Sequence, residues 1–219
     1  MAVTLPSHAQ IIVIGGGIIG CSTAYHLARD HKADVLLLER AKRSSASITQ
    51  VLRYSVDLYK KLDAETGLAT GWKMTGCLRL ATNQERWTEY KRLATTARSF
   101  GLEMQLLSPA EVKAMWPLMA TDDLVGASFL PTDGQASPSD ITQSLAKGAR
   151  MHGAKIVEGV KVTGFDIADG RVRAVKTNHG TISCETVVNC GGQWARQIGA
   201  MAGVSVPLQP VKHQYIVTE

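Results

Sequence analysis

Residues 11–20, IIVIGGGIIG, are followed at residues 35–39 by VLLLE, and together these two stretches decide the fold. The four apolar residues before the glycines are typical of a buried parallel strand, and the segment after the glycines is typical of a helix. Gly15, Gly17 and Gly20 have G-x-G-x-x-G spacing, which allows a tight turn, close approach of a pyrophosphate, and packing of helix on strand. The sequence therefore predicts a βαβ unit that binds a dinucleotide.

The ends of these elements supply the expected contacts to the dinucleotide. A helix N-terminus offers main-chain N–H donors and a partial positive charge, so the pyrophosphate needs no lysine. Glu39 ends the second strand about 20 residues after the last glycine, where a carboxylate can accept hydrogen bonds from ribose hydroxyls. The signature alone does not distinguish FAD from NAD.

Length and composition indicate a globular protein with a sizeable core. The chain has 219 residues, of which 45% are apolar. No apolar run approaches the length of a membrane span, and residues 1–10 lack the features of a secretory signal. We therefore expect a cytoplasmic protein without a membrane partner, or a mitochondrial matrix protein in a eukaryote.

Cysteine spacing and charge exclude other classes of partner. The four cysteines have no C-x-x-C spacing, which predicts reduced thiols and no metal site. The net charge of +5 is spread along the chain. Its densest cluster, Arg40, Lys42 and Arg43, has no interleaved aromatic residues, so we expect no nucleic acid partner.

The middle of the chain alternates predicted helices and strands. These are an amphipathic helix over residues 48–65, a strand over 77–80, a helix from Asn83 to Gly101, and a short helix starting at the capping box of residues 108–111. A turn at residues 131–134 then precedes a helix that starts at Ser137 or Ser139 and ends near His152.

The last third of the chain has the pattern of a β-meander followed by a returning strand. Short β-rich segments begin at residues 155–157 and are separated by turns at Asp169 and Asn178. An apolar strand over residues 186–190 then leads into glycines and a helical segment over 194–202. Helices do not alternate with strands throughout, as they would in a simple NAD domain, so this order favours a flavoprotein.

With these motifs, the chain resembles the D-amino-acid-oxidase-like FAD-dependent oxidoreductases, and among them the dimethylglycine and sarcosine dehydrogenase branch. The resemblance covers nearly every residue. Its most specific matches, beyond the glycines, are residues 54–56, 65–67, 70–72, 107–109, 131–134, 188–195, 206–208 and 213–215.

The resemblance implies an α/β fold: an FAD-binding Rossmann-like βαβ unit with an inserted helical, substrate-side segment and a β-meander. It implies that residues 1–219 are the amino-terminal part of one oxidoreductase domain. The flavin-binding portions would be about 8–47 and 139–207, and the substrate-side portions about 72–138 and 208–219.

The resemblance also implies a reaction, the oxidation of an N-methyl amino acid such as sarcosine or dimethylglycine by hydride transfer to FAD. The resulting iminium would yield a demethylated amine and a one-carbon unit. An electron-transfer flavoprotein is a candidate partner. Two alternatives stay open: a non-catalytic regulatory subunit that keeps the flavoprotein fold, and an NAD-dependent dehydrogenase.

Site residues follow from the resemblance, position by position. The predicted cofactor-binding residues beyond the glycines are Ile18 and Ile19 at the pyrophosphate, Glu39 and Arg40 at the ribose, Val162 at the adenine, and Gly191 and Trp194 near the dinucleotide. Simpler interpretations exist for three of them: Val162 as an ordinary strand residue, Trp194 as core and Arg40 as a surface charge.

His213 is the catalytic candidate. An imidazole with a pKa near neutrality could keep the substrate amine in its neutral, hydride-donating form, or pair with the substrate carboxylate. A histidine beside a tyrosine on a strand can equally be a structural residue. The other five histidines lie in helical, terminal or turn contexts and are expected to be structural or exposed.

The chain departs from the family pattern in two places. The family has a loop after the Glu-Arg pair that follows the isoalloxazine and often carries the histidine of a covalent flavin bond, but here Arg40 leads directly to residues 41–47 and no histidine follows until His152. The strand pattern of residues 211–218 is also still running at Glu219. We therefore expect an incomplete domain that lacks dehydrogenase activity.

Overall fold

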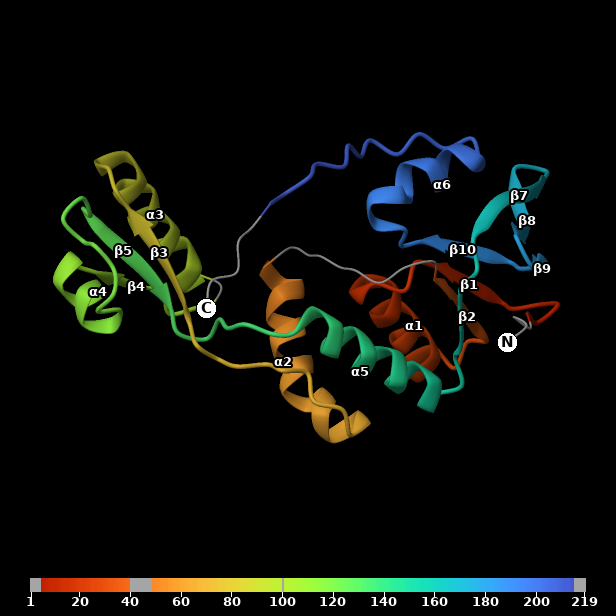
Figure 1. Ribbon diagram of the computed structural model, residues 1–219, viewed down its shortest axis with the longest axis horizontal. Helices are drawn as coiled ribbons and strands as arrows, with labels where there is room; N and C mark the ends of the chain where they lie inside the picture. The colour runs from red at the N-terminus through yellow and green to blue at the C-terminus, as the bar shows by residue number, and fades with distance from the viewer. Residues whose placement is uncertain (1–4, 40–48, 100, 215–219) are drawn as a thin grey trace. The chain divides into compact units, whose positions relative to one another are not determined.

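The computed structural model describes residues 5–39, 49–99 and 101–214 (Figure 1). The chain divides into two compact units. The first contains Met1–Thr70 and Ser137–Glu219, and the second is the contiguous segment Gly71–Ala136.

A four-stranded parallel sheet forms the centre of the first unit. Its order is β10 (Thr186–Asn189), β1 (Ile11–Ile14), β2 (Val35–Glu39) and β6 (Lys155–Glu158), and every neighbouring pair is parallel. Ile14 lies opposite both Leu38 and Asn189, so the carboxyl ends of three strands meet at one edge.

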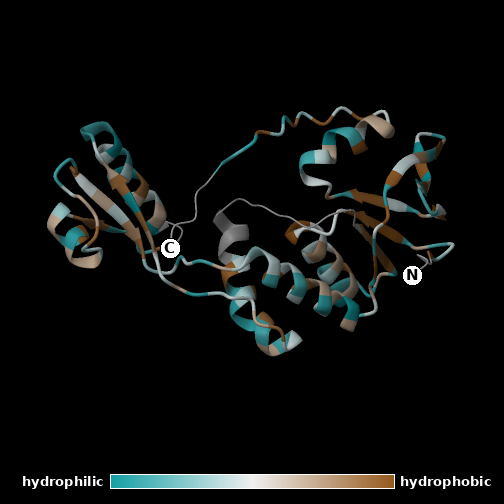
Figure 2. Ribbon diagram, in the orientation of Figure 1, coloured by the Kyte–Doolittle hydropathy of each residue, from teal (hydrophilic) through white to brown (hydrophobic). Residues whose placement is uncertain are grey.

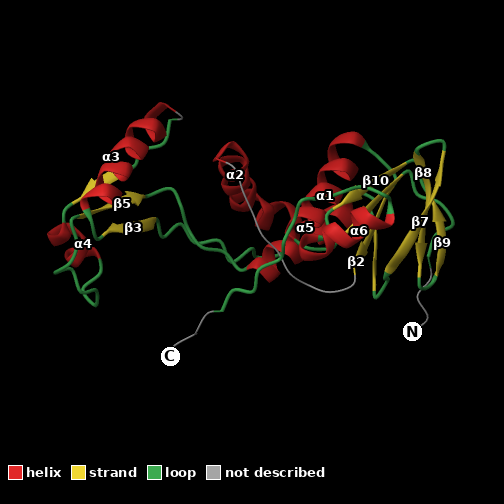
Figure 3. Ribbon diagram, turned by 90° about the horizontal axis from the view of Figure 1, so that it is seen from above, coloured by secondary structure: helices red, strands yellow, loops and turns green. Residues whose placement is uncertain are grey.

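Two layers enclose this sheet, as Figure 3 shows: helices on one face and a β-meander on the other. The helices against the sheet are α1 (Ile18–His31) and α5 (Pro138–Met151), which pack on each other, and α2 (Thr49–Thr66) packs on α5. The meander consists of β7 (Val162–Ala168), β8 (Arg171–Thr177) and β9 (Gly180–Ser183), in that order and antiparallel.

The core between sheet and meander follows from the alternation of side chains along β1 and β2. Successive residues of a strand point to opposite faces, so alternate positions reach the meander. The buried cluster there contains Ile12, Ile14, Leu36 and Leu38 from the sheet and Val160, Val162, Val175 and Ile182 from the meander side. Figure 2 shows β1, β2 and β10 mostly in brown, whereas the meander strands have mixed colours.

One strand expected in the meander belongs to the parallel sheet instead. Residues 155–157 form part of β6, which pairs in parallel with β2. The expectation was wrong because a strand that follows a helix crossing over the sheet arrives parallel to its neighbour, whereas a meander strand follows a hairpin turn. The helix α5 directly before β6 was the signal.

The second unit has its own sheet and core. The antiparallel sheet has the order β3 (Cys77–Ala81), β5 (Gly126–Leu130) and β4 (Gln105–Leu107). Helix α3 (Gln84–Ser99) begins after Asn83, whose Oδ1 accepts from Arg86 N at 2.8 Å, and α4 (Pro109–Met115) has the expected capping box. The capping signals thus predicted both helix starts correctly.

After β10 the chain forms η1 (Gly192–Trp194) and α6 (Ala195–Met201), and residues 204–214 have no regular secondary structure. The strand expected from Val211 is therefore absent over 211–214, and its remaining residues lie outside the described part. An alternating sequence becomes a strand only when a neighbour takes its hydrogen bonds, and no strand of the described residues pairs with it.

Among the described residues, no helix combines the length and the apolar character needed to cross a membrane.

Candidate functional site

The predicted dinucleotide site lies at the carboxyl edge of the parallel sheet, where β1 and β10 each lead into a glycine turn. A main-chain hydrogen bond joins each turn to the end of the adjacent strand. Gly15 N donates to Leu38 O of β2 at 2.9 Å, and Cys190 N donates to Ile14 O of β1 at 2.8 Å. The glycine turn after β1 and the glycine turn after β10 are therefore adjacent, although 175 residues separate Gly15 from Cys190.

Gly15 and Gly20 occupy positions that exclude a side chain. Gly15 has a φ of +110°, and a Cβ there would lie 2.2 Å from Cys190 O, where ordinary contact begins near 3.4 Å. A Cβ on Gly20 would lie 1.7 Å from Gly15 O. These are the tight turn and the close helix packing that the spacing predicts.

The start of α1 leaves main-chain donors available. Its N-cap is Gly17, which makes no side-chain cap, and its first turn has no acidic residue. The first N–H groups of any helix lack a partner within the helix, and here they belong to a turn formed by Ile18, Ile19 and Gly20. With a φ of −69°, Gly17 has a conformation open to any residue, so its expected role, leaving room for a pyrophosphate, stays a prediction.

A second loop, which follows β10, is ordered by Asn189, a residue that sequence reasoning did not select. Gly191 N donates to Asn189 Oδ1 at 3.1 Å, and Asn189 Nδ2 donates to Ala195 O at 2.9 Å. Trp194 N donates to Gly191 O at 2.9 Å, and the Trp194 side chain is half-buried. The available signal was a strand-ending asparagine directly before a glycine turn.

The two loops carry no charged side chain. Residues 11–25 and residues 186–195 contain no Asp, Glu, Lys, Arg or His. Burial raises the pKa of the Cys190 thiol, which therefore stays neutral near pH 7. An anion at this edge would meet main-chain N–H groups and the positive end of the α1 dipole.

The structure brings together Gly15, Gly17, Gly20, Gly191 and Trp194. β2 ends at Glu39, opposite Glu158 in the backbone register, but the Glu39 side chain and all of Arg40 lie outside what is described. Val162 begins β7 with its side chain 8% exposed in the core, so its main chain is the part left for an adenine. His213 is exposed and makes no hydrogen bond recorded among the described residues.

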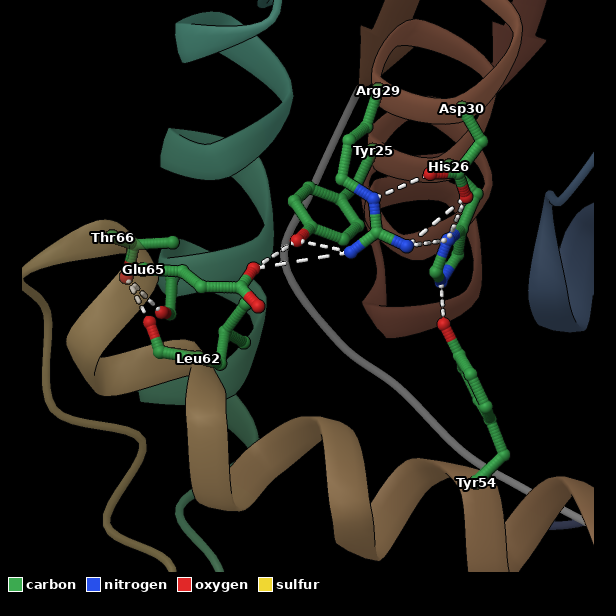
Figure 4. A network of polar contacts seen from close by, with 9 residues as sticks. Tyr25, His26, Arg29, Asp30, Tyr54, Leu62, Glu65 and Thr66 are labelled. Carbon is green, nitrogen blue, oxygen red and sulfur yellow. Dashed lines mark hydrogen bonds and ion pairs between the residues drawn. The ribbon is translucent and has the colours of Figure 1, made fainter.

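A polar network on α1 ties this helix to α2 (Figure 4). Tyr25 is 1% exposed, and its hydroxyl donates to Glu65 Oε2 and accepts from Arg29 Nη1, the latter at 2.7 Å. Arg29 also donates from Nε to Asp30 Oδ1 at 2.6 Å. Burial and the bond to Glu65 raise the pKa of Tyr25 to about 12. The network ties α1, whose N-terminus lies at the predicted dinucleotide site, to α2.

His26 extends this network to Tyr54. The Tyr54 hydroxyl lies 3.2 Å from His26 Nε2, and His26 Nδ1 lies 3.0 Å from Asp30 Oδ2. The bonds from Arg29 and His26 hold the pKa of the Asp30 carboxyl well below its usual range. The Tyr54 side chain is 49% exposed, so this end of the network is open to solvent.

We expect Tyr25→Phe to destabilise the protein by about 1–3 kcal/mol, because Glu65 and Arg29 lose a buried hydrogen-bond partner. A raised tyrosine pKa means that this group contributes stability below pH 10, the ordinary value, and that the contribution is lost as pH rises towards 12. Urea unfolding at pH 8 and pH 11 measures both effects. The variant should therefore lose less stability than the parent between the two pH values.

Tyr54→Phe is the matched control, because it removes one hydroxyl of the same network at an exposed ring. Its effect should stay within about 0.5 kcal/mol. Equal destabilisation by the two variants would show that burial of the Tyr25 hydroxyl does not determine its contribution.

Comparison with known proteins decides the family. A family model described as FAD dependent oxidoreductase matches residues 10–49 and 40–219. The chain belongs to this family. The match confirms the predicted family and its cofactor, FAD.

Three curated relatives refine this assignment. Mouse mitochondrial sarcosine dehydrogenase is 43% identical over 237 residues, with coverage of 98% of this chain and 26% of that protein. Rat mitochondrial dimethylglycine dehydrogenase is 33% identical over 226 residues, with coverage of 96% and 26%. The mouse regulatory subunit of pyruvate dehydrogenase phosphatase is 34% identical over 235 residues, with coverage of 99% and 27%. The chain thus spans about a quarter of each of these relatives.

Solved structures confirm the mixed α/β fold class. L-proline dehydrogenase from P. horikoshii superposes with a TM-score of 0.84 at 36% identity, covering 91% of this chain and 57% of that one. Glycine oxidase from Geobacillus kaustophilus gives a TM-score of 0.77 at 27% identity, covering 91% and 60%.

Proposed function

We propose that the carboxyl edge of the parallel sheet binds the ADP half of FAD. The observation that carries this proposal is the pair of adjacent glycine turns, in which a Cβ on Gly15 would lie 2.2 Å from Cys190 O. The first turn of α1, which offers main-chain donors, has no acidic residue. The main chain can therefore approach a pyrophosphate closely. Glu39 would accept from the ribose hydroxyls, and the backbone at Val162 would meet the adenine.

We infer further that the fold is that of an amine dehydrogenase that acts on N-methyl amino acids. The names of two relatives, sarcosine dehydrogenase and dimethylglycine dehydrogenase, support this inference. When bound, FAD accepts the hydride in such a reaction. The role of this chain would be to hold the dinucleotide at Gly15, Gly17, Gly20 and Glu39. In a protein of this fold with an intact flavin site, a histidine at the position of His213 would act on the substrate amine or carboxylate. An electron-transfer flavoprotein would take the electrons, and the mitochondrial matrix would be the compartment in a eukaryote.

We also propose that this chain binds FAD without oxidising an amine. Mouse sarcosine dehydrogenase aligns over 237 residues, more than the 219 of this chain, so it has residues in the aligned region that this chain lacks. The family match is split into two stretches that overlap at residues 40–49, where we expect the isoalloxazine loop to be missing. Hydride transfer requires close placement of the reacting atoms, which such a loss would impair.

A second candidate function is a non-catalytic regulatory subunit. The specific observation in its favour is the similarity to the pyruvate dehydrogenase phosphatase regulatory subunit along 99% of this chain. The loss of flavin-site residues would fit a protein that keeps the fold and not the chemistry.

An anaerobic reconstitution tests the proposed function. We expect the protein to bind added FAD, and we expect sarcosine or dimethylglycine to leave the flavin absorption band unchanged. Acid precipitation should release all of the flavin into the supernatant. Bleaching of the band by either amine, or flavin retained in the pellet, would contradict the proposed loss of activity while leaving the FAD site intact.

A further inference from the structure

The helices and strands of the second unit, Gly71–Ala136, pack on one another. β5 is the middle strand of its sheet and pairs with both β3 and β4. α3 packs on all three strands, and α4 packs on β4 and β5. The buried residues Leu107, Val112 and Ala127 form a core with partly buried neighbours from β3 and β5. A contiguous segment with its own sheet and core has the features of a cooperative folding unit.

The two ends of this unit are joined to each other by main-chain hydrogen bonds. Lys73 N donates to Gln135 O at 2.8 Å, and Gln135 N donates to Lys73 O at 2.9 Å. Gly76 N donates to Asp133 O at 2.9 Å. We call these four residues the clasp. Because they lie where the chain enters and leaves the unit, their bonds close the unit on itself.

Gly134 leaves no room for a side chain beside the clasp. A Cβ there would lie 2.2 Å from Lys73 O and 3.0 Å from Met74 Cα, which are both main-chain atoms. Lys73 O is the acceptor of the bond from Gln135 N, so relief of this overlap would open the clasp. Substitution of Gly134 is therefore a way to open the clasp with one methyl group.

The first unit is held by bonds of its own on both sides of the clasp. Before the clasp, Thr70 N donates to Asp63 Oδ1 at 2.8 Å. Ser144 Oγ of α5 also donates to Leu68 O at 3.2 Å. After the clasp, Ser137 is the N-cap of α5. These bonds join residues of the first unit only, so they do not require a folded second unit.

We propose that the clasp makes Gly71–Ala136 a separate cooperative unit, which unfolds and refolds while the parallel sheet and its glycine turns stay folded. Proteins open in contiguous cooperative units whose local stabilities differ widely. The predicted dinucleotide site would therefore stay formed when the second unit is open. This inference is independent of the proposed function, because it concerns the folding of the second unit and not the binding of a ligand.

Hydrogen exchange of the full chain, followed by mass spectrometry of its peptides, tests the proposal with Gly134→Ala. The main-chain amides of β3, β5 and α3 should exchange at least about tenfold faster than in the parent, and those of β1, β2 and α1 should change by less than about twofold. A second unit that is fully unfolded beside an unchanged first unit would also support the proposal. Unchanged exchange in the second unit, or equal acceleration in both units, would overturn it.

Tyr25→Phe is the reciprocal variant, because it removes a buried hydrogen bond within the first unit. Exchange should become at least about fivefold faster in α1 and α5, whereas β3, β5 and α3 should stay within about twofold of the parent. Equal acceleration of the second unit would show that the two units unfold together, which would contradict the proposal.

Added FAD separates this inference from the proposed function. Saturating FAD should slow exchange in the first unit and leave the second unit unchanged, because a ligand stabilises the unit that binds it. Equal slowing of both units would contradict separate unfolding. A lack of any effect of FAD would contradict the proposed FAD site, whereas the two variants test separate unfolding without a ligand.

Discussion

Gly15→Ala is expected to abolish measurable FAD binding, with a loss of at least about a hundredfold in affinity. The alanine Cβ would lie 2.2 Å from Cys190 O and 3.2 Å from Gly191 N, and the φ of +110° is one that side chains rarely adopt. Relief requires the two glycine turns to separate, which moves the main-chain donors away from the pyrophosphate. Flavin fluorescence titration measures the affinity, and urea unfolding measures the accompanying loss of stability.

Gly153→Ala is the matched control for this variant. Gly153 has a similar φ of +95°, but no atom lies within 4 Å of the position that its Cβ would take. Gly153→Ala should therefore lose about 1–3 kcal/mol of stability through conformational strain and keep the parent's affinity for FAD. If Gly15→Ala bound FAD as the parent does, the glycine turns would not be the pyrophosphate site.

Glu39→Ala is expected to weaken FAD binding by at least about tenfold. Charge-assisted hydrogen bonds from the ribose hydroxyls are worth roughly 1.5–3 kcal/mol, and each 1.4 kcal/mol is a factor of ten in affinity. The same change should weaken ADP-ribose binding equally, because the contact is to the ribose of the ADP half.

The neighbouring strand provides the control. Glu158 lies opposite Glu39 in the register of β2 and β6, so Glu158→Ala removes the same charge one strand farther from β1. It should leave FAD affinity within about twofold, a difference expected from screened charge alone. Equal effects of the two substitutions would indicate general electrostatics instead of a specific ribose contact.

The glycine turn, the helix N-caps and the returning strand were predictable because their signals are local. Gly15 has a positive φ in the turn directly after β1, and a Cβ on Gly20 would meet Gly15 O in the same turn. Ser108 and Asn83 each accept from an N–H three residues later in the helix that they cap. The pairing of β6 with β2 was not predicted, since pairing depends on which strand end a crossover helix reaches and not on the strand's own sequence.

The same limit applies to the site. Sequence spacing identified the first glycine turn, but the role of Asn189 in ordering the second depends on bonds to Gly191 and Ala195 that form only when β10 leads into α6. The contact between Tyr25 and Glu65 joins residues 40 positions apart on two helices. It could not be predicted because it depends on how the two helices pack. The predicted strand at Val211 was wrong over the described residues. Alternating apolar and polar residues indicate which face of a strand would be buried, but they do not supply a neighbouring strand to pair with.

The central claim is that the carboxyl edge of the parallel sheet binds FAD through its ADP half. Titration of the protein into FAD, followed by flavin fluorescence with ADP-ribose or riboflavin as competitor, tests this claim most directly. The account predicts a saturable fluorescence change that ADP-ribose reverses and riboflavin at the same concentration does not. No saturable change, or displacement by riboflavin as effective as that by ADP-ribose, would contradict it.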